Sequence, residues 1–236
     1  MRNLILLFLV LSSPTYGQVD PYFSLKIGSN ISYRNLSPIN EMTEGWKIYF
    51  KNRRKVEKPA IRESFGLNLG LSLFGKLKIE SGIFYNRLGD REKVEILTLQ
   101  PEGFYDHETY RAKHSYLYLT VPIKFYFEII RIQDVKVSTG LFGSYNRLLN
   151  YRTIEPRTRK ETFGNPSTYS IFMTEINNSP LEAGVVLKAE KNIKENVNLD
   201  FEINIGSHIQ PSLIRELVVE HTINRVSLRF GYTYFF

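Results

Sequence analysis

The chain has 236 residues, of which 23% are charged and 42% are hydrophobic, and its formal net charge is +7. With a mean hydropathy of −0.24 it is too polar for a bundle of transmembrane helices, and its length suits one all-β domain. The absence of cysteine excludes disulfides, thiolate chemistry and cysteine-based metal sites.

The amino-terminal residues are typical of an export signal. Arg2 provides a positive charge, and residues 4–11 are all apolar, a run much shorter than the roughly 20 residues of a spanning helix. Small residues follow, with Thr15 and Gly17 at the −3 and −1 positions before Gln18. We therefore expect residues 1–17 to be a cleaved signal peptide and residues 18–236 to form one mature domain.

Eight segments of the mature chain alternate between apolar and polar residues. A period of two is the pattern of a β-strand with one apolar face. In the second segment, for example, Leu67 and Leu69 share a face opposite Asn68 and Gly70. In chain order the predicted strands are residues 22–33, 63–74, 77–88, 114–128, 135–149, 181–189, 197–205 and 225–236.

The connections between these strands differ in length in a regular way. Polar stretches at 34–62, 89–113 and 150–178 are long, whereas 75–76, 129–134 and 190–196 are short, and 207–222 is intermediate. Transmembrane barrels have an even number of strands, short periplasmic turns and long outer loops. Strands of this length, tilted by about 40°, also match an apolar band roughly 25 Å tall.

Aromatic residues gather near both ends of the apolar faces, as in interfacial girdles. At the turn end they are Phe23, Phe125, Phe127 and Phe236, and at the loop end they are Tyr33, Phe65, Tyr85 and Tyr145. A soluble, lipocalin-like barrel would turn its apolar face inward around a ligand and would need neither girdles nor long loops on one side. The predicted fold is therefore an all-β, eight-stranded antiparallel transmembrane up-and-down β-barrel with short periplasmic turns and long extracellular loops.

The last predicted strand reads "RVSLRFGYTYFF" and ends the chain on an aromatic residue. Soluble domains tend to fray at their last residues. A bacterial outer-membrane barrel instead closes its last strand on its first, and we interpret Phe236 as its sorting signal. The predicted location is the bacterial outer membrane, as an integral protein.

Three strings carry a resemblance to a known family. "YLYLTVPIKFYF" at 116–127, "VSTGLFGSYNRLL" at 137–149 and "VSLRFGYTYFF" at 226–236 resemble strands of the PorT-like outer-membrane β-barrel proteins of Bacteroidetes. The resemblance implies an eight-stranded barrel, and one branch of the family assists protein secretion. It implies no catalytic residues.

An eight-stranded barrel has an interior that side chains can fill. The inward positions supply cations and carboxylates that persist in a buried place only when paired. We expect a lumen charge network that includes Lys26, Glu80, Asp200, Glu202 and Arg229, with Arg229 bridging to Asp200 or Glu202. Further inward residues are Lys78, Lys124, Lys136, Lys188 and Glu182, with Phe84, Tyr118 and Phe142 as bulk.

The first long loop is basic, with eight Lys or Arg against three Glu between residues 34 and 62, a balance of +5 (8 − 3). An exported barrel has no reason to meet nucleic acid, whereas lipid A phosphates are a dense anion beside it. We predict phosphate contacts by Lys51, Arg53, Arg54 and Lys55. A merely solvated cationic loop is the alternative.

The four histidines, His107, His114, His208 and His221, are all predicted to be solvated, in or beside the outer loops. A Ser-His-carboxylate set can be drawn from Ser207, His208 and Glu220, or a pair from His221 and Ser212, but their spacing does not require catalysis. No His-x-His, His-Glu-x-x-His or acidic calcium loop is present. We therefore predict no enzyme activity, cofactor or metal.

Three classes of function remain. The first is a monomeric, non-enzymatic barrel that acts as a structural or interaction protein through its extracellular loops, in contact with outer-membrane lipid and lipopolysaccharide. The second is an accessory component of a protein-secretion or envelope-assembly machine, with envelope or secretion proteins as partners. The third is a lipid-modifying barrel enzyme, which only the loop histidines suggest.

Overall fold

The computed structural model of the protein describes residues 19–38, 57–99, 105–154, 157–160, 174–176, 179–210, 213–215 and 219–236. The predicted signal peptide, residues 1–17, lies outside these ranges.

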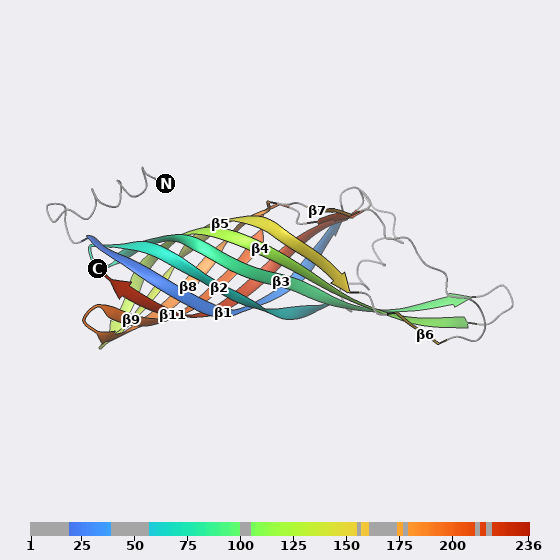
Figure 1. Ribbon diagram of the computed structural model, residues 1–236, viewed down its shortest axis with the longest axis horizontal. Coiled ribbons are helices and arrows are strands. Elements are labelled where there is room, and N and C mark those ends of the chain that lie inside the picture. The colour runs from blue at the N-terminus through green and yellow to red at the C-terminus, as the bar shows by residue number, and fades with distance from the viewer. Residues whose placement is uncertain are drawn as a thin grey trace.

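Eight long strands form the wall of a barrel (Figure 1). They are β1 (Val19–Pro38), β2 (Glu57–Leu73), β3 (Leu77–Leu99), β4 (Tyr105–Ile132), β5 (Val135–Ile154), β8 (Leu181–Lys194), β9 (Val197–His208) and β11 (Val219–Phe235). Three short strands, β6 (Arg157–Lys160), β7 (Thr174–Ile176) and β10 (Leu213–Arg215), pair outside this wall with β4, β10 and β11.

The sheet closes on itself, which confirms the predicted fold class. Each wall strand pairs antiparallel with its neighbours in the order β1-β2-β3-β4-β5-β8-β9-β11, and β11 pairs back with β1. The closing register runs from Tyr22 opposite Phe235 to Pro38 opposite Val219. Closure leaves no unpaired edge along the wall, as a membrane-spanning sheet requires.

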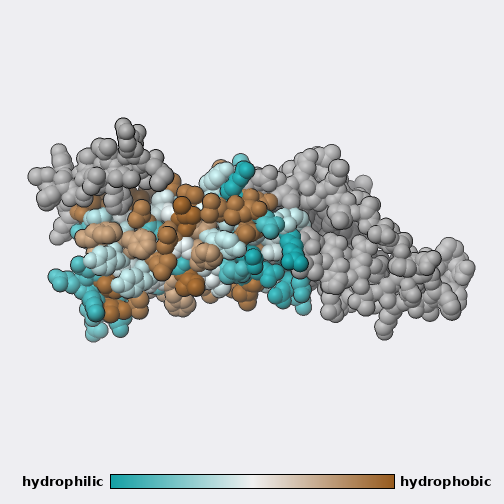
Figure 2. Space-filling model, viewed as in Figure 1, coloured by the Kyte–Doolittle hydropathy of each residue, from teal (hydrophilic) through white to brown (hydrophobic). Residues whose placement is uncertain are grey.

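Each strand places apolar residues outside and polar residues inside. On β1, Leu25 and Ile27 are 53% and 68% exposed, whereas Lys26 between them is fully buried. Tyr33 and Tyr145 are exposed at one end of the wall and Phe127 at the other. Figure 2 shows hydrophobic residues over the middle of the barrel and hydrophilic ones mostly toward its ends. Such inverted polarity is stable when lipid, not water, surrounds the wall.

Tight turns connect the strands at one end of the barrel. Phe74 and Gly75 take positive φ angles of 54° and 68° between β2 and β3, and Gln133 takes 51° between β4 and β5. Lys76 N donates to Leu73 O at 3.2 Å, which closes the first of these turns. The predicted short turns therefore lie together, opposite the long connections.

Most wall strands are longer than predicted. The polar stretch 89–113, predicted as a loop, is largely a hairpin in which β3 continues to Leu99 and β4 begins at Tyr105. The predicted connection 190–196 is a turn at 195–196 only, because β8 runs to Lys194. The loss of apolar residues marks where a strand leaves the lipid, but backbone hydrogen bonding continues beyond that point.

No helix long and apolar enough to cross a membrane occurs within the described ranges.

Candidate functional site

Charged side chains fill the interior of the barrel, because the alternation of each strand turns them inward. Among the described residues, seven cations and six carboxylates are each no more than 5% exposed, a balance of +1 (7 − 6). The cations are Lys26, Arg34, Lys78, Lys124, Lys188, Arg225 and Arg229, and the carboxylates are Glu80, Asp90, Glu182, Glu190, Asp200 and Glu202.

Glu80 on β3 is one of two centres of this network. Its carboxylate oxygens lie 2.5 Å from Lys188 Nζ and 3.2 Å from Lys26 Nζ. The hydroxyls of Tyr22 and Tyr126 each lie 3.0 Å from it. Asn68 Nδ2 on β2 donates to it at 3.2 Å, so side chains from five strands meet at this carboxylate.

Glu202 on β9 is the other centre. Its carboxylate pairs with Lys26 and lies 2.6 Å from Lys124 Nζ and 3.3 Å from Arg229 Nη1. The Tyr126 hydroxyl lies 2.7 Å from Glu202 and so stands between the two carboxylates. Because Lys26 contacts both centres, the two form one cluster.

Smaller ion pairs continue the network toward both ends. Toward the turns, Lys78 pairs with Glu190. Toward the long connections, Arg225 Nη2 donates to Glu182 Oε2 at 2.8 Å, and Ser144 Oγ donates to the same oxygen at 2.9 Å. Nearer the outer rim, Arg34 Nε lies 2.9 Å from Asp90 Oδ2.

Aromatic rings fill the space beside the charges. The Phe84 ring lies 4.3 Å from Arg229 Cζ and 5.2 Å from Lys124 Nζ, both suitable cation–π distances. Closer to the outer end, Leu88, Tyr116, Tyr118 and Ile223 form a buried apolar cluster. Paired charges and packed rings together occupy the interior, which in an eight-stranded barrel is just wide enough for side chains to fill.

The structure brings the predicted network residues together. Lys26, Glu80, Asp200, Glu202 and Arg229 all lie in the lumen, each no more than 4% exposed. Arg229 stands opposite Glu202 in the β9–β11 register and pairs with it, whereas Asp200 stands opposite Gly231. Asp200 instead accepts from Thr233 Oγ1 at 2.7 Å. Of the further inward residues, Lys136 is only partly buried.

Four of the buried charges were not predicted from the sequence, namely Arg34, Asp90, Glu190 and Arg225. Glu190, for example, falls in the predicted connection 190–196, although the alternation of β8 continues through it and turns it inward. Counting the period through the polar ends of each strand identifies all four. The inward positions of Tyr22 and Tyr126 also follow from the alternation, but their hydrogen bonds to the carboxylates do not.

The histidine prediction was wrong for two residues. His114 and His208 lie at the outer end but inside the barrel, 6% and 4% exposed. The His208 ring packs edge-on against Tyr118 at 5.7 Å. Ser207 and His208 are consecutive on β9, so their side chains point to opposite faces of the wall. The side chains of His107, Ser212, Glu220 and His221 lie outside the described part of the chain.

The other predicted site residues lie either outside the described ranges or at the end of the last strand. Lys51, Arg53, Arg54 and Lys55 lie outside the described residues. Phe236 is 73% exposed, its ring packs edge-on against Tyr234 at 5.7 Å, and its N donates to Pro21 O at 3.1 Å. Among the described residues, no group of His, Asp or Glu is arranged to hold a metal ion.

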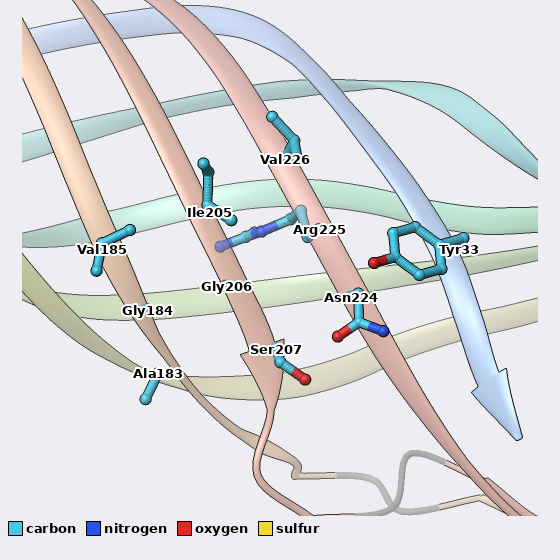
Figure 3. Close-up of a pocket in the computed structure, with 10 residues that line it drawn as sticks. All are labelled: Tyr33, Ala183, Gly184, Val185, Ile205, Gly206, Ser207, Asn224, Arg225 and Val226. Carbon is cyan, nitrogen blue, oxygen red and sulfur yellow. The ribbon is translucent and has the colours of Figure 1, made fainter. Parts of the chain in front are cut away.

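A hollow of about 290 Å³ lies on the wall across β8, β9, β11 and β1 (Figure 3). Ala183, Gly184, Gly206 and Ser207, all small, contribute to its lining. Figure 3 shows the Arg225 side chain passing behind β9 at Gly206, its partner in the register. Outward-facing Val185 and Ile205, about half exposed, border the hollow, so it belongs to the membrane side of the wall and not to the lumen.

A closed barrel with an apolar exterior and a paired, charged interior defines a β-barrel of the outer-membrane class. No protein-family model and no curated protein sequence matches the chain.

Similar solved structures come from the same class. Neisserial surface protein A is 11% identical, with 89% of this chain and 95% of that one covered and a TM-score of 0.38. The outer membrane protein OprG from Pseudomonas aeruginosa is 10% identical, with 93% and 98% covered and a TM-score of 0.40. The outer membrane protein AlkL is 10% identical, with 95% and 93% covered and a TM-score of 0.36. Likenesses this distant carry no conclusion about what this chain binds.

Proposed function

We propose that this outer-membrane barrel is a non-enzymatic structural and interaction protein, which binds a partner protein through its extracellular side. The observation that carries the proposal is the β3–β4 hairpin, which extends past the rim of the barrel (Figure 1).

Beyond the rim the two strands stay paired and form an arm, which consists of residues 91–99 of β3 and 105–113 of β4. Its register continues beyond the buried rim residues Asp90 and His114 to Leu99 opposite Tyr105. The ten residues from Asp90 to Leu99 span roughly 30 Å, because the nine steps between them rise about 3.3 Å each. A lipid-embedded wall needs no such extension, so its formation favours a role outside the membrane.

The arm has one edge that suits protein binding. β6 covers the β4 side at residues 107–110. On the other side, pairing with β2 ends at Glu92, and among the described strands β3 then pairs only with β4. A free strand edge presents unpaired N–H and C=O groups to which an extended segment of another protein can add.

The side chains that occupy the lumen support an interaction role over transport. A pore for solutes would need an open path along the axis, whereas the Glu80 and Glu202 cluster joins side chains from opposite parts of the wall.

A second candidate is an accessory component of a secretion or envelope-assembly machine, which the PorT-like resemblance suggests. Among the described strands β3 beyond Glu92 pairs only with β4, and this edge favours the second candidate if the segment that adds to it belongs to an envelope protein.

Photo-crosslinking in intact cells tests the proposal. A crosslinking amino acid at Glu95 or Ile96, successive positions on β3, should capture a protein, whereas the same group at Lys194, beside a short turn, should not give that product. Joining Arg91 directly to Lys113 by a short turn should abolish the crosslinked product while the barrel stays in the outer membrane. Capture of lipid alone from both positions would refute a protein-binding arm.

A further inference from the structure

We propose that the outside of β3, β4 and β5 carries a second site, which binds the phosphate groups of lipopolysaccharide through Arg87, Arg91, Lys113 and Arg152. The inference rests on the proposed outer-membrane function and is independent of the basic segment 51–55.

The strand register gathers these four cations. Arg91 stands opposite Lys113, and one outward row nearer the membrane Arg152 stands opposite Ser115. Arg87 lies on β3, four residues before Arg91. Arg87 and Arg91 face outward, because the intervening Leu88 and Asp90 are buried in the lumen. Lys113 and Arg152 are exposed on the neighbouring strands, and Lys113 directly precedes the buried His114.

A glycine lies at the centre of the group. Gly89 is the register partner of Ser115 and has no side chain. A Cβ at this position would lie 2.4 Å from His114 O and 3.5 Å from Arg62 Nε, so the fold admits no larger residue between the cations. Direct cross-strand neighbours have Cβ atoms about 5 Å apart and diagonal ones about 7–8 Å, so long cationic side chains can converge over Gly89.

The electrostatics of the group call for an anion. Like charges directly opposite, as in Arg91 and Lys113, destabilise a sheet. In the described part of the chain, Glu63 is the carboxylate paired with this group, at 2.7 Å from Arg87 Nη1. The balance is therefore +3 (4 − 1). Arg91, Lys113 and Arg152 are all exposed, which leaves them accessible to a multivalent anion.

The height of the group on the wall identifies the anion. Tyr85, four residues before Gly89 on β3, stacks on Phe65 with ring centroids 4.6 Å apart, in the loop-end girdle. Girdle aromatics sit at the level of the lipid headgroups. The cations thus lie at and just outside the headgroups of the outer leaflet, where lipopolysaccharide presents phosphates that arginine binds by charge-assisted hydrogen bonds.

Binding of lipid A by the purified full-length barrel in detergent tests the inference. The double substitution Arg91→Gln with Lys113→Gln should weaken binding of bisphosphorylated lipid A about tenfold and flatten its salt dependence. It should leave the weaker binding of dephosphorylated lipid A unchanged. Lys191→Gln with Lys194→Gln, which removes the same charge from exposed residues near a short turn, is the matched control and should not alter binding.

A charge reversal separates binding from structure. Arg91→Glu places an opposite charge beside Lys113, so it should leave the barrel at least as stable while lipid A binding falls as far as in the double variant. Unchanged binding in both variants, or equal binding of phosphatidylglycerol, would overturn the site. Heat-dependent gel mobility of every variant reports on the barrel itself, so a failure of the site is distinct from a failure of the proposed outer-membrane function.

Discussion

Replacing Glu202 by Gln should be among the most destabilising conservative changes in the lumen. The amide keeps the shape of the side chain but removes the charge that faces Lys26, Lys124 and Arg229. Lys26 retains Glu80 at 3.2 Å, but Lys124 then has Glu80 only at 4.0 Å. Within the described part of the chain, the buried charges change from seven cations against six carboxylates to seven cations against five. Leaving buried charge uncompensated costs about 3–5 kcal/mol of unfolding free energy.

Removing the opposite partner should cost less. In Arg229→Met, Glu202 keeps both lysines and the buried charges become six against six. What is lost is hydrogen bonding to Glu202, Ser64 and Asn86 and the contact with the Phe84 ring, about 2–3 kcal/mol in all. Arg229→Met should also offset part of the Glu202→Gln cost in the double variant, because it removes one of the uncompensated cations.

Urea-dependent folding into lipid vesicles, followed by the gel mobility of unboiled samples, measures these differences. The expected order of stability is wild type, Arg229→Met, the double variant and Glu202→Gln. If Arg229→Met is as destabilising as Glu202→Gln, or if the two costs simply add, then charge balance does not govern the lumen.

Three further outcomes are expected. Leu67 lies at mid-wall between Leu25 and Ile83, and Leu67→Arg should cost about 2–4 kcal/mol of unfolding free energy in the same vesicle assay. Tyr33→Arg at the girdle should cost at most about 1 kcal/mol. Equal costs would mean that the membrane does not lie where the girdle places it. Planar-bilayer recordings of the purified protein should show no steady conductance, since a stable current would mean that the charge network does not close the lumen. Deleting Phe236 should lower the yield of assembled barrel in cells, and unchanged assembly would remove its sorting role.

The sequence alone determined the wall of this protein. Lipid requires an apolar side chain at every second residue of a spanning strand, so alternation marks each strand and the face it turns outward. The same parity predicted that Lys26, Glu80, Asp200, Glu202 and Arg229 face inward, because a strand has only two faces.

Only the tertiary structure decided which inward charges meet. Lys26 and Glu202 are 176 residues apart, and their contact depends on closure of β11 onto β1 and on the stagger between strands, which alternation does not encode. The sequence also did not predict how far β3 and β4 extend, for a related reason. Beyond the membrane, water lies on both faces of a strand, so the sequence there need not alternate. The strands continue because their backbone hydrogen bonds continue. His114 and His208 were wrongly predicted to be solvated. The polarity of the sequence indicates where a strand leaves the lipid, whereas burial at the rim depends on what packs across the lumen.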